Sequence, residues 1–242
     1  DLKAAGINLP EAAKNSRVDL MQTESISNVG ESDGLFVGRE NLLNALEDGF
    51  KEGYHIQFIG GGNGWGKSRV ALEYAQRHAS EYKIICWINA SDEIYITSSI
   101  VSFFNLAQVS YKDTSPSSMA ELFCRFFEEN RDWLIIFDNA DLKLSHQQTM
   151  LKKYMPSEEG HIIVTGNFSE TAGMGHHKYY LLERLNEEPS GSSLSPELSE
   201  LCWGQPLPMT LISSYIRESS WVVAGTYLHM LDESGVGKEI CP

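Results

Sequence analysis

Short apolar runs alternate with segments of helical periodicity along most of the chain. The runs have the length and composition of β-strands and lie at 54–59, 84–89, 133–137, 161–165 and 178–182. Apolar residues recur at helical spacing between them, which predicts helices that begin near Arg39 and cover 67–80, 92–107, 116–130 and 145–153. Regular alternation of strand and helix is typical of an α/β fold, in which helices cover both faces of a mostly parallel sheet.

The residues on either side of this region have different patterns. Residues 1–35 are rich in small and polar side chains with little periodicity, which predicts a lead-in or linker. Strand-like runs end near 183, and the segments 196–203, 207–218 and 222–233 have helical spacing. We therefore expect an α/β domain at 36–183 and a small helical subdomain at 184–242, with the polar stretch 186–196 as a hinge.

The overall composition is that of a globular protein with an acidic excess. With 33 acidic and 19 basic residues, the net charge is -14, which disfavours electrostatic binding of nucleic acid or an anionic membrane. No apolar run is long enough to cross a bilayer, and no signal peptide is evident. The four scattered cysteines form no CxxC pair, which favours reduced thiols and a cytoplasmic location. Because the first residue is Asp1 and not Met, we expect a piece of a longer protein.

A glycine-rich motif follows the first predicted strand directly. Residues 61–68 read GGNGWGKS and match the phosphate-loop pattern G-x-x-x-x-G-K-[ST]. Glycines allow successive backbone N–H groups to surround a phosphate, and Lys67 adds a cation at the start of a helix, where the dipole favours anions. The hydroxyl of Ser68 can bind Mg²⁺. The alternative is a chance match in a glycine-rich turn, which is disfavoured because the next helix has an apolar stripe of Val70, Ala71, Tyr74 and Ala75.

A second motif places a carboxylate at the end of a buried strand. The sequence WLIIFDNAD at 133–141 has an apolar run that ends in Asp138, as in a Walker B site. A carboxylate at that position can hold Mg²⁺ and its waters, whereas the alternative is an ordinary strand-to-turn cap. Together with the phosphate loop, the pattern favours the metal role. We therefore predict Ser68 and Asp138 as the metal site, and Lys67 and Asp138 as the catalytic residues of what is at most a weak ATPase.

Several short motifs occur in an order that resembles a known family. FVGRE (36–40), the phosphate loop, LIIFDNAD, HIIVTGN (161–167) and GQPLP (204–208) follow one another along the chain. In this order they resemble the NB-ARC family of STAND ATPases, found in plant resistance proteins, animal apoptosome scaffolds and immune receptors of fungi and bacteria. The wording is most similar to the fungal and bacterial members. The family fold implies that the strand of HIIVTGN lies between the phosphate-loop strand and the Walker B strand.

The resemblance also implies roles for individual residues. Val37 and Arg39 would contact the adenine side of ATP or ADP, Thr165 would be the sensor residue, and Pro206 would pack on the nucleotide from the helical subdomain. The residues expected to bind phosphates are Gly61, Asn63, Gly64, Trp65, Gly66, Lys67, Ser68 and Arg69, with Mg²⁺ as the second cofactor. The implied function is an adenine-nucleotide-dependent switch that controls self-association. Fused effector and repeat sensor domains of an NLR-like signalling protein would lie outside this chain.

Three asparagines depart from the family pattern. Asn63 replaces a loop glycine, and we expect the loop to form because asparagine tolerates positive φ. Asn139 replaces the acid that follows Asp138, and Asn167 replaces an arginine that reaches the γ-phosphate in relatives. These departures leave an alternative open, in which the chain is a non-hydrolysing scaffold for protein–protein assembly. A small-molecule phosphotransferase is a weaker alternative, since no arginine-rich lid is evident.

Overall fold

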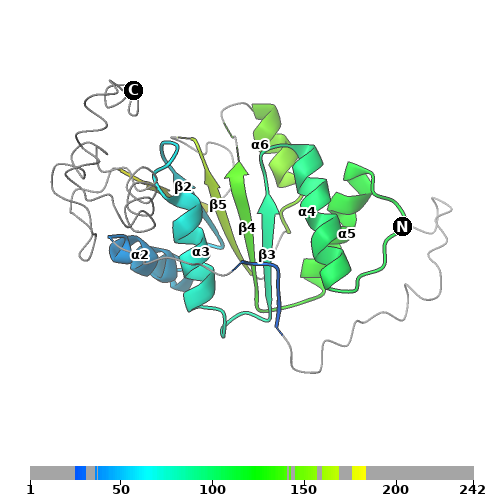
Figure 1. The fold of residues 1–242 in the computed structure, drawn as a ribbon, viewed down its shortest axis with the longest axis horizontal. Helices are drawn as coiled ribbons and strands as arrows, with labels where there is room; N and C mark the ends of the chain where they lie inside the picture. Colours follow the sequence, from blue (N-terminus) through cyan, green and yellow to red (C-terminus); the bar gives the residue numbers. More distant parts are fainter. Residues whose placement is uncertain are drawn as a thin grey trace, which may run out of the picture.

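The computed structural model describes residues 25–30, 36, 38–140, 142, 145–156, 160–168 and 176–183. The expected helical subdomain at 184–242, with its hinge and Pro206, lies outside the described residues, as does Val37. Within them the chain forms one sheet of parallel strands flanked by helices (Figure 1). The strands are β1 (Ile26–Ser27), β2 (Ile56–Gly60), β3 (Ile84–Asn89), β4 (Trp133–Ala140), β5 (His161–Gly166) and β6 (His177–Leu181).

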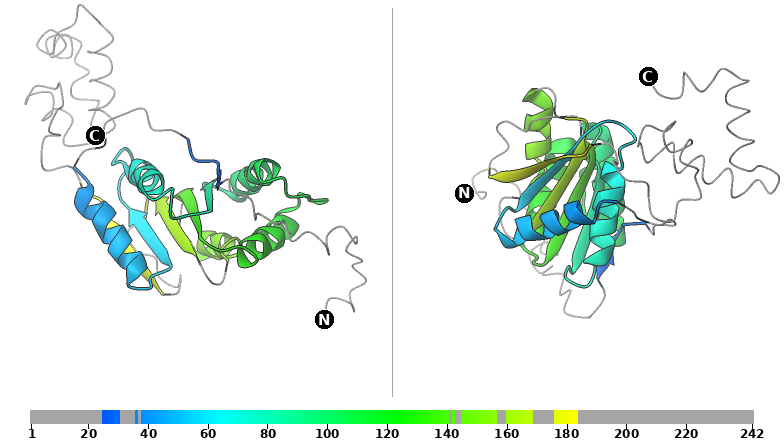
Figure 2. Two further views of the ribbon diagram at one scale, coloured as in Figure 1. Left: turned by 90° about the horizontal axis from the view of Figure 1, so that it is seen from below. Right: turned by 90° about the vertical axis from the view of Figure 1, so that its left-hand side faces the viewer.

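Helices cover both faces of the sheet (Figure 2). The helices are α2 (Glu40–Lys51), α3 (Lys67–Arg77), α4 (Glu93–Leu106), α5 (Pro116–Glu128) and α6 (Ser145–Lys152). Two clusters of buried apolar side chains correspond to the two faces. The first cluster is rich in phenylalanine and joins the sheet to α4, α5 and α6, whereas the second joins it to α2 and α3. The predicted α/β fold is therefore confirmed, with element ends that differ from the prediction by at most three residues.

The strand order is β1-β3-β4-β5-β2-β6, and every neighbouring pair is parallel. Strand β5 lies between β2 and β4, which is the order that the family resemblance implied. Because all strands run in the same direction, their carboxyl ends meet at one edge of the sheet, which is where ligands bind in open α/β folds. Among the described residues, no helix is long and apolar enough to cross a membrane.

The first predicted strand contains a polar residue, Gln57, at a core position. Its side chain lies completely buried between β2 and α2. Its Nε2 donates a hydrogen bond to the carbonyl oxygen of Leu46 at 2.7 Å, so the amide is partly satisfied within the core. A β-carbon at Gly49 of α2 would lie 2.6 Å from Gln57 Oε1, which is too close. Glycine at this helix position therefore makes room for the polar side chain.

Strand β1 is absent from the sequence prediction. It is only two residues long and pairs with β3 through Ile26 opposite Ile84. The side chain of Asn28 then continues the pairing, because its Nδ2 donates to Trp87 O at 2.9 Å and its Oδ1 accepts from Trp87 N at 2.6 Å. Two residues are too few to produce a recognisable strand pattern, so this edge of the sheet is visible only in the structure.

Candidate functional site

The loop between β2 and α3 lies at the carboxyl edge of the sheet (Figure 1). Its glycines Gly61, Gly64 and Gly66 have φ angles of 141°, 76° and 89°, a region that residues with a side chain rarely adopt. Asn63 has no positive φ, so the expectation that it needs this tolerance is wrong. The loop forms with ordinary backbone geometry at Asn63, because the neighbouring glycines make the turns.

Lys67 is the first residue of α3, and its side chain folds over the loop. Its Nζ donates hydrogen bonds to Gly61 O at 3.0 Å and to Gly62 O at 2.8 Å. An ammonium group has three hydrogens, so one remains for a further acceptor. Burial lowers the pKa of Lys67, and the nearby carboxylate of Asp138 partly opposes that shift. The two carbonyl groups therefore orient a cation at the amino end of a helix, where an anion is favoured.

Asp138 receives hydrogen bonds from two different elements. Ser68 Oγ, on α3, donates to Asp138 Oδ1 at 2.6 Å. The hydroxyl of Thr165, which is completely buried on β5, donates to the same oxygen. A hydroxyl and a carboxylate are hard oxygen ligands of the kind that Mg²⁺ prefers. The two residues predicted as a metal site are therefore in direct contact, and Thr165 is hydrogen-bonded to one of them.

A β-bulge brings Asp138 to this position. Phe137 pairs with Val164 and Ala140 pairs with Gly166, so Asp138 and Asn139 together lie opposite Thr165 alone. Asn139 has a φ of 63°, and its backbone N–H donates to Thr165 Oγ1 at 3.1 Å. Bulges re-aim side chains in this way, and asparagine is one of the few residue types that adopt positive φ readily.

Arg39 lies where the chain leaves β6. Its Nη2 donates to the carbonyl oxygen of Glu183, while its buried Nε has no hydrogen-bond partner among the described residues. Burial lowers the pKa of Arg39, and Glu183 acts in the opposite direction. The adjacent Leu182 donates its N–H to Gly60 O at 2.8 Å, just before the loop begins. Arg39 is thus connected to the loop through the exit of β6, and a buried N–H without a partner is a place for a ligand or water.

The structure brings together most of the described residues that were predicted to form the site. Gly61, Gly64, Gly66, Lys67, Ser68, Asp138 and Thr165 share the carboxyl edge of the sheet. Asn63 is exposed on the loop, and Arg69 pairs with Glu73 along α3 at 3.6 Å. No sequence pattern indicates the contributions of Gly62 O, Asn139 N and the β6 exit, because backbone groups contribute through the fold and not through residue type.

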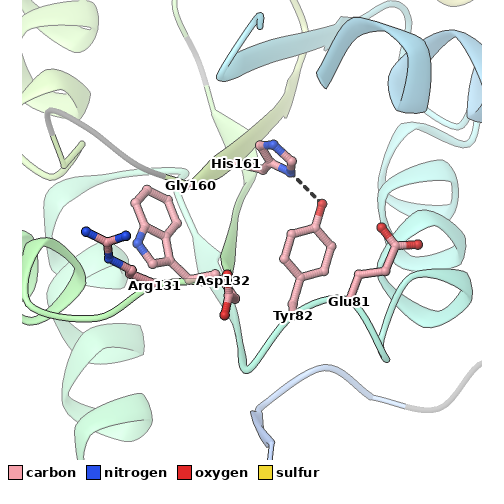
Figure 3. Close-up of a pocket in the computed structure, with 7 residues that line it drawn as sticks. Glu81, Tyr82, Arg131, Asp132, Gly160 and His161 are labelled. Atoms are coloured by element: carbon pink, nitrogen blue, oxygen red, sulfur yellow. Dashed lines mark hydrogen bonds between the residues drawn. The ribbon is translucent and has the colours of Figure 1, made fainter. Parts of the chain in front are cut away.

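A crevice of about 320 Å³ lies at the opposite edge of the sheet. Figure 3 shows its lining, formed by Glu81, Tyr82, Arg131, Asp132, Trp133, Gly160 and His161. Trp133 and His161 are the first residues of β4 and β5, so the crevice is at the amino ends of these strands. The Tyr82 hydroxyl and His161 Nδ1 are hydrogen-bonded at 2.7 Å. The crevice is therefore separate from the candidate site.

Comparisons with solved structures agree with the fold. No protein-family model and no curated protein matches the sequence. A signal transduction ATPase with numerous domains and a tetratricopeptide repeat sensor, from Pyrococcus horikoshii, is similar over 81% of this chain and 32% of its own, with 21% identity and a TM-score of 0.49. The Walker-type ATPase of Pyrococcus abyssi is similar over 90% of this chain and 76% of its own, with 14% identity and a TM-score of 0.54. The similarity to the P. abyssi structure, together with the parallel sheet, shows that the chain has the fold of a P-loop ATPase. The chain spans about a third of the P. horikoshii protein.

Proposed function

We propose that this chain binds adenine nucleotide with Mg²⁺ and acts as the core of a nucleotide-dependent switch. The observation that carries the proposal is the contact between Ser68 Oγ and Asp138 Oδ1 at 2.6 Å, directly beside Lys67. A hydroxyl on the phosphate-loop helix α3 and a carboxylate on β4 have come together, as a phosphate-bound Mg²⁺ requires. A simple glycine-rich turn would need neither the contact between Ser68 and Asp138 nor the hydrogen bond from Lys67 to the loop.

The phosphates of the nucleotide would be held by the loop and the start of α3. Left-handed glycines allow several N–H groups to point toward one anion, and the helix dipole adds to the charge of Lys67. This local positive potential opposes the overall charge of -14, so anion binding depends on the loop geometry and not on the long-range field.

Ser68 and Asp138 would hold Mg²⁺, and Thr165 would orient the carboxylate. The metal would neutralise charge on the phosphates. Groups that hydrogen-bond to a metal ligand fix its orientation and change metal affinity substantially. The buried hydroxyl of Thr165 has this position relative to Asp138.

A switch also needs a connection between the nucleotide and the rest of the protein. The exit of β6 supports such a connection, because Leu182 contacts the residue before the loop and Glu183 contacts Arg39. In this proposal Val37 and Arg39 bind the adenine side, and Pro206 closes the site from a helical subdomain at 184–242. The α/β domain would be residues 36–183, with β1 of the preceding segment 1–35 added at the edge of its sheet.

The order of motifs supports a finer proposal of NB-ARC type. Exchange of ADP for ATP would then open the protein, allow it to self-associate and activate an effector domain, as in NLR-like proteins. A ligand shifts such an equilibrium only through contacts that differ between the two states. The second candidate, a non-hydrolysing nucleotide-binding scaffold, is favoured by the neutral side chain of Asn139 immediately after Asp138 and by that of Asn167 after β5.

Calorimetry with Lys67→Ala tests the proposal. The unchanged protein should bind ADP and ATP, and the variant should bind each about 100-fold more weakly because a charge-assisted hydrogen bond is lost. Lys178→Ala is the matched control, since Lys178 is on β6 and pairs with Glu52. We expect the control to keep its affinity. Unchanged affinity in Lys67→Ala would show that the phosphate loop is not the binding site.

A further inference from the structure

The indole ring of Trp65 lies directly against the backbone of the phosphate loop. A β-carbon added at Gly62 would lie 2.7 Å from Trp65 Cε2 and 2.9 Å from its Nε1. At Gly61 the corresponding position is 3.2 Å from Trp65 Cε3 and 2.9 Å from the carbonyl oxygen of Leu182. Carbon atoms do not approach to 2.7 Å without displacement, since their optimal separation is about 3.5–4.0 Å. The ring therefore occupies the space that any side chain at Gly62 would need.

The ring also contacts the protein core. Trp65 is half-buried and packs against the cluster that joins the sheet to α2 and α3. A tryptophan is large and rigid, so it holds its position once its body is packed. Trp65 thus connects the core to one segment of the loop, Gly61–Gly62.

That segment carries both acceptors of the Lys67 ammonium group. Gly61 O and Gly62 O lie 3.0 Å and 2.8 Å from Lys67 Nζ. A shift of either peptide would change the direction of the third N–H of the ammonium group. Binding constellations have to be held to within about 0.5 Å to be productive, so support behind these peptides matters for affinity.

We propose that Trp65 is a positioning residue for nucleotide binding, acting on Lys67 through the Gly61 and Gly62 carbonyl groups. This inference rests on the proposed function of the loop. The phosphate-loop motif requires no particular residue type at position 65. The inference gives the large side chain found there a specific task, which is to set the affinity for the phosphates. The alternative is that Trp65 only fills space and contributes to stability.

Trp87 provides a matched control. It is also half-buried and packs against the same cluster, but it lies on β3, separated from β2 by β4 and β5. Trp65→Val and Trp87→Val remove the same side-chain volume, so we expect both to lower the melting temperature. Calorimetric titration with ADP and Mg²⁺ should show about ten-fold weaker binding for Trp65→Val. The affinity of Trp87→Val should be unchanged. Equal affinities for Trp65→Val and the unchanged protein would overturn the positioning role.

A second pair of variants tests the contact itself. Gly62→Ala should weaken ADP binding about ten-fold in the unchanged protein, because its methyl group displaces either the ring or the loop. With valine at position 65 the space is open, so adding Gly62→Ala should cause little further loss. Additive effects of the two substitutions on both affinity and melting temperature would overturn the inference.

The two proposals fail in different ways. Absence of any nucleotide binding in the unchanged protein would overturn the proposed function and the positioning role together. Normal binding that is insensitive to Trp65→Val would overturn the positioning role alone and leave the proposed function standing.

Discussion

Thr165 and Asp138 lie on adjacent parallel strands, and the hydroxyl of Thr165 donates a hydrogen bond to the carboxylate of Asp138. The same hydroxyl oxygen accepts the backbone N–H of Asn139, the extra residue of the β4 bulge. One buried side chain therefore fixes both the direction of the carboxylate and the backbone that carries it. Ser68 completes the arrangement from α3.

Thr165→Val tests this relationship, because valine has nearly the same shape but no hydroxyl. Asn139 N would lose its acceptor, so we expect the free energy of unfolding to fall by about 1–3 kcal/mol. If Asp138 binds Mg²⁺, the Mg²⁺-dependent part of ADP affinity should also fall, by about ten-fold or more. Titrations with and without Mg²⁺ measure this part. Thr165→Ser retains the hydroxyl, so this variant should keep most of the Mg²⁺-dependent affinity for ADP. A Thr165→Val variant whose ADP affinity depends on Mg²⁺ as fully as that of the unchanged protein would contradict the orienting role.

The backbone of Asn139 gives a second prediction, on stability. Its φ of 63° is unfavourable for most residues with a β-carbon. Asn139→Ala should therefore lower the free energy of unfolding in urea by about 1 kcal/mol, whereas Asn139→Gly should be close to neutral. Equal losses in the two variants would mean that the asparagine side chain matters and that the conformation does not.

The fold could be predicted because its signals are local. Buried strands such as β3 and β4 are continuous apolar runs, and α3 has its apolar stripe on one side. Strand β1 has no comparable signal, since it depends on pairing with β3 and on the side chain of Asn28. Gln57 is a polar residue in a core position because Gly49 makes room for it, and such a pair is not recognisable before the elements are packed.

The candidate site was predictable to the extent that it depends on residue type. Lys67, Ser68 and Asp138 were predicted from their motifs, and the structure places them together. Positive φ occurs at Asn139 and not at Asn63, where the motif led us to expect it. The bulge that causes it depends on the register between β4 and β5, and register is a property of the sheet and not of one strand. The contact of Trp65 with Gly62 likewise depends on how the loop folds back.

A third prediction concerns pH and the crevice at the amino edge of the sheet. Burial lowers the pKa of His161 to about 4; nearby His55 and His78 act in the same direction, and Glu81 opposes them. The unfolded chain has a histidine pKa of about 6.5, so between these values it binds a proton that the folded protein does not. The contribution of His161 to the free energy of unfolding is complete above about pH 6.5 and is lost as the pH falls toward 4. Unfolding in urea at several pH values should show this loss.

His161→Phe separates this group from the others. Phenylalanine can keep the stacking on Phe50, whose ring centre is 4.0 Å away, but it cannot titrate or bond to Tyr82. We expect a lower stability at neutral pH and a smaller decrease between pH 6.5 and 4. His146→Ala, which removes an exposed histidine on α6, is the control for the loss of a histidine outside the crevice. A His161→Phe variant with the full decrease would assign the pH dependence to another group.

The last prediction concerns Asn167, which is exposed just beyond β5 and two residues after Thr165. In the proposed nucleotide site, an arginine at this position would place a charge near the γ-phosphate, a contact that only ATP can make. Asparagine offers at most a neutral hydrogen bond, and charge-assisted bonds are about twice as strong. We therefore expect this protein to separate ATP from ADP weakly, and Asn167→Arg to raise the preference for ATP about ten-fold, or by 1–2 kcal/mol. Competitive titration measures the ratio, and Asn167→Gln, which is longer but neutral, should leave it unchanged. A strong preference for ATP in the unchanged protein would mean that another cation contacts the γ-phosphate and that Asn167 is not at the sensor position.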